Sequence, residues 1–263
     1  MISFVGAGPG APDLITLRGA ARLAAADVVI WASSLVPEAL LTHARPQAEI
    51  HDSAVMTLED VLALYQHHPD PAAIVRLHSG DPALYGAIQE QIDWCRAHDR
   101  PFEIVPGVSS LAAAAAAVQR ELTVPSVAQS VVVTRLPGRT RASMPSRETL
   151  AAFAAIGATT AVFLSAARPH ELQAELLGPT SAYHPATPAA IVIRASWPDQ
   201  QVVTTSVGHL AEDLAATGAT TTVLVLVGPA LDAEAARSHL YSPEFAHRFR
   251  RRSAPGSTAG RPA

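Results

Sequence analysis

The chain has 263 residues, of which 49% are hydrophobic and 16% are charged, and its formal net charge is −4. This length allows one large domain or two of ordinary size, and the net charge argues against a dedicated nucleic-acid binder. No apolar run reaches the roughly 18 residues that a transmembrane helix needs, so we expect no association with a membrane.

The cysteine and lysine content indicates the cellular compartment and the kind of anion recognition that the chain can use. Cys95 is the only cysteine, so no internal disulfide can form, and the first residues lack the basic segment of a signal peptide. We therefore expect a cytoplasmic protein. Lysine is absent and all nineteen basic residues are arginines, so any recognition of an anion must use the guanidinium group.

Strands alternate with helices in the first part of the chain. The predicted strands are residues 2–5, 28–31, 74–77 and 102–105, and the predicted helices are residues 14–26, 35–44, 87–94 and 111–118, with a further helix capped by Thr57 and Asp60. Several strands are continuously apolar, which is typical of parallel strands with both faces covered. The carboxyl ends of such strands lie at one edge of the sheet, where α/β proteins bind ligands.

Four turns rich in glycine, serine or proline follow these strands and should line that edge. They are residues 6–10, 33–34, 79–81 and 107–110. The third lies within the polar stretch 76–86, Arg-Leu-His-Ser-Gly-Asp-Pro-Ala-Leu-Tyr-Gly. We expect Asp81 to be the N-cap of the next helix, with Pro82 at its first position. This stretch is the predicted centre of the site.

The alternation of strands and helices is interrupted near residues 121–126. We place the boundary there between a first domain, 1–122, and a second domain, 123–235. The later strands are predicted at 130–134, 160–164, 189–193, 201–205 and 222–227, and helices at 146–156 and 168–177. Residues 195–200 indicate a hairpin turn that would pair Ile191 with Val203, so the second sheet should be mixed. Residues 236–263 are a C-terminal extension that we expect to be partly disordered.

Residues 6–11 match the dinucleotide-binding pattern G-x-G-x-x-A between a strand and a helix. Two features count against that interpretation. Pro9 has no N–H to donate to a pyrophosphate, and no Asp or Glu ends strand 28–31 to hold a ribose. A P-loop is excluded because the chain has no lysine. The turn is then either a plain tight turn or one whose backbone approaches an uncharged or cationic ligand, and we favour the second.

The residue pattern argues against a metal site and against a hydrolase, and it leaves the role of one arginine cluster open. The histidines are not spaced as metal ligands, so no metal site is expected. Ser109 and Ser110 have no evident base partner, which argues against a hydrolase. Arg135, Arg139 and Arg141 follow a predicted strand, and they form either a solvated loop or an anchor for a ligand with several carboxylates.

An ordered set of motifs resembles the tetrapyrrole methyltransferases that use S-adenosylmethionine. These motifs are residues 6–10, 76–88, 106–110 and 134–140. Within that family, residues 34–36, 78–82, 121–125 and 195–199 look most like the precorrin-4 C-11 methyltransferases of cobalamin biosynthesis. The resemblance covers residues 1–230 approximately.

The resemblance implies a fold of two α/β domains with the cofactor in a cleft between them, and a homodimer. It also implies methyl transfer from S-adenosylmethionine to C-11 of precorrin-4, which gives precorrin-5. Two alternatives stay open. One is a sister methyltransferase that acts on uroporphyrinogen III or precorrin-3B, and the other is a non-catalytic tetrapyrrole-binding module.

The resemblance also implies site residues. The positions that match cofactor contacts are Pro9, Ser79, Gly80, Asp81, Leu84, Ser109 and Ser110 in the first domain and Leu164, Ala195 and Thr222 in the second. For the substrate, we expect Arg135 and Arg139 to bind carboxylates, and His78 and Tyr85 to orient the macrocycle. No side chain is expected to act as a nucleophile, because a macrocycle carbon has that role. The chain departs from the family at Ala11, where Asp is usual, and in the loop 141–147.

Overall fold

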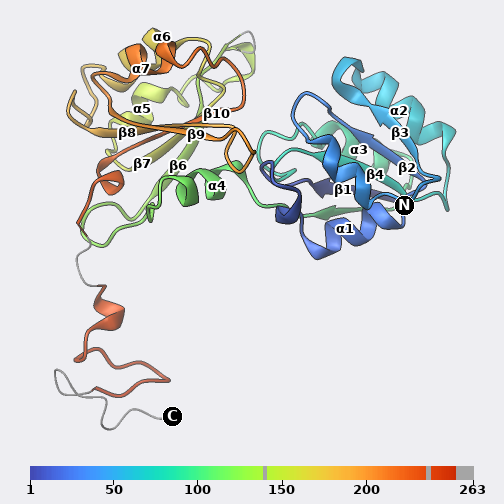
Figure 1. The fold of residues 1–263 in the computed structure, drawn as a ribbon, viewed down its shortest axis with the longest axis horizontal. Helices are drawn as coiled ribbons and strands as arrows, with labels where there is room; N and C mark the ends of the chain where they lie inside the picture. Colours follow the sequence, from blue (N-terminus) through green and yellow to red (C-terminus); the bar gives the residue numbers. More distant parts are fainter. Residues whose placement is uncertain (139–140, 235–237, 253–263) are drawn as a thin grey trace.

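The computed structural model describes residues 1–263 except 139–140, 235–237 and 253–263. It contains two α/β domains, each built on a five-stranded sheet (Figure 1). Residues 238–252 extend away from both domains, and the predicted disorder of the tail falls on residues 253–263, outside the described part. No helix among the described residues is long and apolar enough to cross a membrane.

The first sheet is wholly parallel, as predicted. It consists of β1 (Ile2–Gly6), β2 (Val28–Trp31), β3 (Glu49–Asp52), β4 (Ile74–His78) and β5 (Phe102–Val105), in the order β3-β2-β4-β1-β5. A hydrophobic cluster covers each face of this sheet. The edge strand β3 was not predicted, because three of its four residues are polar or charged and most of it is exposed.

The helices that accompany the first sheet are α1 (Leu17–Ala24), α2 (Leu58–His67) and α3 (Gln89–Ala97), and α4 (Ser110–Ala117) follows its last strand in sequence. The capping box of Thr57 and Asp60 at the start of α2 is confirmed. The prediction for residues 35–44 is wrong in type, because Glu38–His43 is a 3-10 helix.

The predicted bounds of α1 are also wrong. Pro12–Leu14 forms a separate 3-10 turn, and the Thr16 hydroxyl caps the helix by accepting a bond from the Gly19 N–H. This start rotates Leu17 out to 92% exposure and leaves Gly19 and Leu23 as the buried residues.

The second sheet is mixed, as predicted. Its strands are β6 (Val131–Arg135), β7 (Thr159–Phe163), β8 (Pro188–Ile193), β9 (Gln201–Ser206) and β10 (Val223–Val227), in the order β6-β7-β10-β8-β9. Only β6 and β7 pair in parallel. Ile191 lies opposite Val203, so the hairpin prediction is confirmed.

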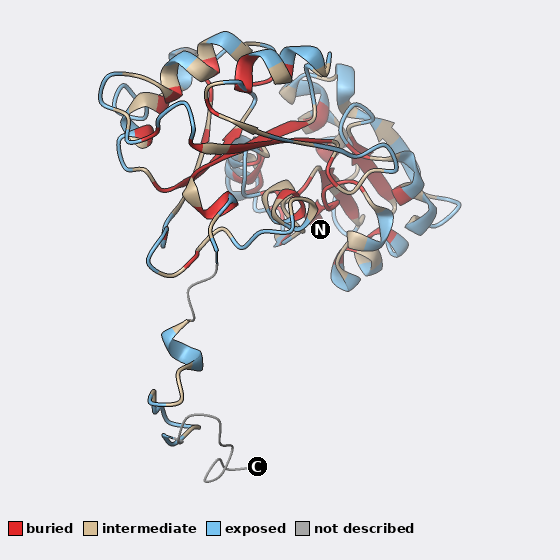
Figure 2. Ribbon diagram, turned by 60° about the vertical axis from the view of Figure 1, so that its left-hand side comes forward, coloured by how far each residue is buried: buried red, intermediate tan, exposed pale blue. Residues whose placement is uncertain are grey.

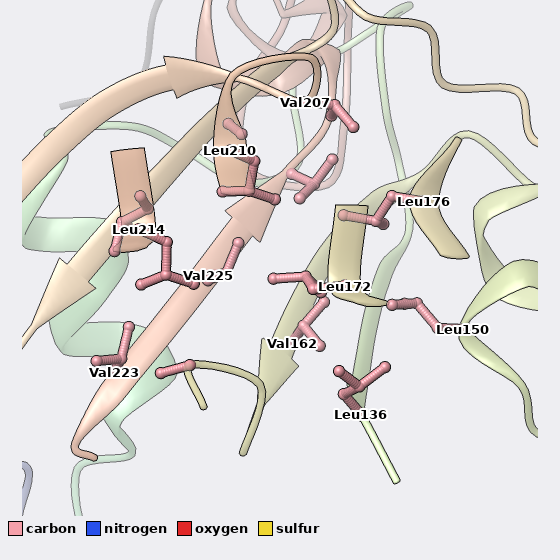
Figure 3. Packing of buried hydrophobic residues seen from close by; sticks show 14 of the residues in the cluster. Leu136, Leu150, Val162, Leu172, Leu176, Val207, Leu210, Leu214, Val223 and Val225 are labelled. Atoms are coloured by element: carbon pink, nitrogen blue, oxygen red, sulfur yellow. The ribbon is translucent and has the colours of Figure 1, made fainter. Parts of the chain in front are cut away.

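One face of the second sheet packs against α5 (Leu150–Ala154), α6 (Pro169–Leu176) and α7 (Leu210–Ala216). The resulting core includes the fully buried Leu172 and Leu210 (Figure 3). Helix α7 was not predicted from the sequence. Figure 2 shows that the central strands of both sheets are buried between their covering layers, whereas the edge strands β3 and β9 contain no buried residue.

Helix α4 covers the opposite face of the second sheet (Figure 1). Its Ala113 and Ala114 pack in one cluster with Ala161, Ala190 and Leu224. The run of alanines in this helix lets it approach the sheet closely. A helix that precedes the proposed boundary at residues 122/123 therefore contributes to the core of the second domain.

Candidate active site

Three strand-end turns of the first domain meet at the carboxyl edge of its sheet. A Cβ added to Gly6 would lie 2.4 Å from Gly107 Cα and 2.7 Å from the Gly80 oxygen. Real Cβ atoms essentially never approach other atoms this closely, so the turns after β1, β4 and β5 can meet only with glycine at positions 6 and 107.

Main-chain hydrogen bonds hold the first two turns together. The Gly80 N–H donates to the Gly8 oxygen at 2.8 Å, and the Gly8 N–H donates to the Gly80 oxygen at 3.3 Å. The Ala7 N–H donates to the His78 oxygen at 2.7 Å. These N–H groups are used within the protein, which agrees with the interpretation that the glycine-rich turn is not a phosphate site.

Asp81 fixes the third turn with both carboxylate oxygens. Oδ1 accepts a bond from the Ala83 N–H at 2.8 Å, and Oδ2 accepts one from the Gly107 N–H at 2.9 Å. The predicted helix N-cap role is wrong, because α3 begins only at Gln89. Tyr85, with φ of 58°, interrupts the helical conformation in between, so Asp81 caps a local turn instead.

A cavity of about 370 Å³ lies between the two domains, within the size range of small-molecule and cofactor sites. Its wall includes all ten residues predicted to contact the cofactor: Pro9, Ser79, Gly80, Asp81, Leu84, Ser109, Ser110, Leu164, Ala195 and Thr222. The fold brings them together because the second-domain residues adjoin the ends of β7, β8 and β10. Their contact with a cofactor stays a prediction.

The wall of this cavity carries little charge. Asp81 and Tyr85 are the only ionisable residues among those that line it, and the others are apolar, hydroxyl-bearing or glycine. Burial raises the pKa of the Tyr85 hydroxyl, against the nearby Arg135 charge, so this group is protonated at neutral pH. A wall without a cation is poorly suited to a phosphate and well suited to a neutral or cationic ligand.

Three non-glycine residues of the wall have left-handed backbone conformations. The φ angles are 58° at Tyr85, 53° at Leu164 and 55° at Thr222. This conformation is unfavourable for L-residues, especially a β-branched one such as Thr222. Such strain is concentrated at ligand sites in many proteins, where the surrounding structure maintains it.

The turn between β8 and β9 contacts the glycine-rich turn across the domain boundary. Trp197 donates from Nε1 to the Pro9 oxygen at 2.9 Å, and the Ala11 N–H donates to Ser196 Oγ at 2.9 Å. A Cβ on Gly10 would lie 2.2 Å from Trp197 Cδ1, so the indole packs directly on that glycine. These contacts hold the two sides of the cavity at a fixed separation.

Comparison with known proteins identifies the family. Residues 1–211 match the family model described as Tetrapyrrole (Corrin/Porphyrin) Methylases. The chain belongs to the tetrapyrrole methylase family.

Individual relatives of this tetrapyrrole methylase agree with that result. It is 43% identical over 253 residues to a Sinorhizobium sp. protein named precorrin-4 C(11)-methyltransferase, a match that covers 95% of this chain and 98% of the relative. A solved cobalamin biosynthetic enzyme, cobalt precorrin-4 methyltransferase, has a TM-score of 0.83 and 39% identity, with 88% and 96% of the two chains covered. A uroporphyrin-III C-methyltransferase from Thermus thermophilus, solved with S-adenosylhomocysteine, has a TM-score of 0.73 and 28% identity, with 88% and 98% covered.

The predicted contact between His78 and the substrate is not supported in this tetrapyrrole methylase. The side chain is only 7% exposed, lies beside the Phe4 ring at 6.2 Å, and is not part of the cavity wall. Burial, together with the nearby Arg76 charge, lowers the pKa of His78 to about 3, so the imidazole is neutral at physiological pH. His78 is therefore a residue of the first-domain interior, beneath the turn it precedes.

The other predicted substrate residues have different positions. Tyr85 lines the cavity, is 48% exposed, and its ring lies 5.2 Å from that of Phe163. Arg135, at the end of β6, donates from Nη2 to Ser143 Oγ at 2.9 Å and is near enough to affect the pKa of Tyr85. Arg139 lies outside the described residues.

Several residues of the cavity wall were not predicted. They are Leu35, Phe163, Ser165, Ala166, Ala167, Val192, Thr220, Thr221, Val223 and Leu224. Strand-end position could have indicated Ser165–Ala167 after β7 and the threonines before β10. Val192 and Leu224 lie within strands and resemble ordinary core residues in the sequence.

Proposed function

We propose that this tetrapyrrole methylase transfers a methyl group from S-adenosylmethionine to C-11 of precorrin-4. The observation that carries the proposal is the interdomain cavity, in which ten positions expected to contact the cofactor come together. The 43% identity to a precorrin-4 C(11)-methyltransferase over nearly the whole chain supports the assignment of the substrate and of the carbon.

The residues of the cavity fit S-adenosylmethionine. Apolar side chains such as Leu84, Leu164 and Val192 suit the flat adenine, and Ser79, Ser110 and Thr222 offer hydroxyl groups. Asp81 is the one acidic residue of the wall, and a carboxylate favours a cationic ligand. When bound, S-adenosylmethionine supplies an electrophilic methyl group on its sulfonium.

The contribution of the protein to this chemistry is positioning. The tight packing of Gly6, Gly80 and Gly107 fixes one side of the cavity, and the Trp197–Pro9 contact fixes it relative to the second domain. Holding two reactants in a productive orientation can contribute about 7–11 kcal/mol to a barrier reduction. No protein nucleophile is required, because the electron-rich carbon of the macrocycle has that role.

The mouth of the cavity fits a large, flat substrate with carboxylates. Leu35, Leu84 and Leu164 belong to the wall and yet are 46%, 39% and 65% exposed. Exposed apolar residues grouped at a cavity are typical of binding surfaces. We propose that the macrocycle lies against them and against Tyr85, with Arg135 and Arg139 at its carboxylates.

A transfer assay tests the function. The purified protein is incubated with methyl-labelled S-adenosylmethionine and, separately, with uroporphyrinogen III, precorrin-3B, precorrin-4 and cobalt-precorrin-4. We expect label in the precorrin-4 products and none in the others. Labelling of uroporphyrinogen III or precorrin-3B instead would indicate a sister enzyme, and no labelling together with no cofactor binding would indicate a non-catalytic module.

Substrate contacts are tested by substitution. We expect Arg135→Ala and Arg139→Ala to raise KM with a smaller effect on kcat, because they remove carboxylate contacts made before and during the reaction. The control is Arg96→Ala, which removes an exposed arginine on α3 that pairs with Asp93. An unchanged substrate dissociation constant in Arg139→Ala would contradict its assignment.

We also propose that the enzyme is a cytoplasmic homodimer. The support is the family resemblance and, for the compartment, the presence of Cys95 as a single, buried thiol. Analytical ultracentrifugation should give twice the mass of the 263-residue chain.

A further inference from the structure

Two histidines and a glutamate form a cluster at the amino edge of the first sheet. His51 Nε2 lies 2.6 Å from Glu49 Oε1, and His68 Nε2 lies 3.4 Å from Glu49 Oε2. One ligand atom from each residue lies within 4.8 Å of the others. Because the histidines are not spaced as ligands in the sequence, this grouping is visible only in the fold.

The cluster is built from two elements. Glu49 and His51 are two residues apart in the edge strand β3, so their side chains project from the same face of the sheet. His68 is the C-cap residue of α2, which brings the chain back to the start of that strand. Its position is fixed by Arg100, which donates from Nη2 to the His68 carbonyl oxygen at 2.6 Å.

One nitrogen of the cluster lacks a hydrogen-bond partner. His68 Nε2 is buried and makes no hydrogen bond within the described residues, although a carboxylate oxygen lies 3.4 Å away. A cation bound by both groups would give this nitrogen and the Glu49 carboxylate a common partner of opposite charge.

We propose that Glu49, His51 and His68 bind one divalent transition-metal ion, with Zn²⁺ as the reference ion. Two imidazole nitrogens and a carboxylate are a common ligand set for zinc. Ligand bonds of about 2.0–2.2 Å in tetrahedral geometry place ligand atoms roughly 3.3–3.5 Å apart. The separations in the structure, which are 2.6 Å, 3.4 Å and at most 4.8 Å, lie on both sides of these values, and solvent would complete the coordination.

The site is separate from the interdomain cavity and does not rest on the proposed function. Glu49 begins β3, whereas the cavity lies beyond the carboxyl ends of the parallel strands. A bound ion would join the outermost strand of the sheet to the end of α2. It would thereby stabilise an edge whose other side has no strand partner in the described structure.

Calorimetry with the metal alone tests the proposal. Tag-free protein is treated with chelator, exchanged into metal-free buffer and titrated with ZnCl₂. We expect one equivalent to bind to the wild type, and binding at least about tenfold weaker in His51→Gln, His68→Gln and Glu49→Gln. The control His43→Gln removes an exposed histidine outside the cluster and should bind as the wild type does.

Two further measurements separate a site from nonspecific binding. Co²⁺ bound by the cluster should give visible absorption bands that His51→Gln and His68→Gln lose and His43→Gln keeps. Zn²⁺ should raise the Tm of the wild type by at least about 2 °C and leave the Tm of these two variants unchanged. Circular dichroism in chelator verifies that each variant is folded. No binding by the wild type, or equal binding by the cluster variants, would overturn the proposal.

Discussion

The substitution Gly107→Ala tests the claim that three main-chain turns must touch to form the cavity. The new Cβ would lie 2.2 Å from the Gly80 oxygen and 2.7 Å from Gly6 Cα. Both obstacles are backbone, so neither can rotate away, and relief requires a turn to move by about 1 Å to restore ordinary contact.

The size of the effect follows from that displacement. Overpacking of this kind costs about 1–3 kcal/mol in the free energy of unfolding, and we expect a value near the upper end because the neighbours are main chain. Movement of Gly80 also shifts Ser79 and Asp81 in the cavity wall. A misplacement of about 1 Å at a site can cost roughly a hundredfold in function, so the affinity for S-adenosylhomocysteine should fall by at least tenfold.

Urea unfolding and calorimetry with S-adenosylhomocysteine measure the two effects. The matched control is Gly178→Ala, where the new Cβ would meet no atom closer than 3.4 Å. We expect that control to unfold and bind as the wild type does. A Gly107→Ala protein with wild-type stability and wild-type affinity would refute the reasoning.

Three other predictions concern single residues. Asp81→Asn should lower the free energy of unfolding by about 1–3 kcal/mol, because one of the two N–H groups bound to its carboxylate loses an acceptor. It should also weaken binding of cationic S-adenosylmethionine more than binding of S-adenosylhomocysteine, and equal losses of affinity by calorimetry would contradict a charge role. For His78, the pKa is about 3 in the folded chain and 6.5 ordinarily, so as the pH falls through 6.5 the unfolded chain takes up a proton that the folded chain does not. Between pH 6.5 and 5.5, the wild type should therefore lose about 1 kcal/mol more stability than His78→Asn in urea unfolding, and parallel pH profiles of the two proteins would exclude this. Leu172→Ala removes a fully buried side chain of the second-domain core and should cost about 2–5 kcal/mol, with no change in affinity for S-adenosylhomocysteine while the protein is folded.

Much of the site could be predicted because its residues follow apolar strands. Parallel strands place their carboxyl ends at one edge, so the turns at residues 6–10, 79–81 and 107–110 had to be neighbours. In the structure, the main chains of Gly6, Gly80 and Gly107 are in contact. The ordered motifs then extended the prediction to second-domain residues such as Leu164.

The errors arise where tertiary contacts override local preference. Asp81 followed by Pro82 is a common start of a helix. In the structure, however, the Gly107 N–H donates to the second carboxylate oxygen of Asp81, and the left-handed backbone conformation of Tyr85 ends the turn. His78 lies in a polar stretch, but strand alternation directs its side chain into the domain interior with Phe4. The Glu49–His51–His68 cluster depends on the return of α2 to β3, which no spacing in the sequence indicates.

The most direct test of the central claim is the position of the transferred methyl group. S-adenosylmethionine carrying a ¹³C-methyl group is incubated with the protein and precorrin-4, and the product is examined by NMR. We predict a single enriched methyl group bonded to C-11, formed at a lower initial rate by Gly107→Ala at matched protein concentration and subsaturating cofactor. Enrichment at any other macrocycle carbon, or none with cofactor bound, would contradict the proposed function.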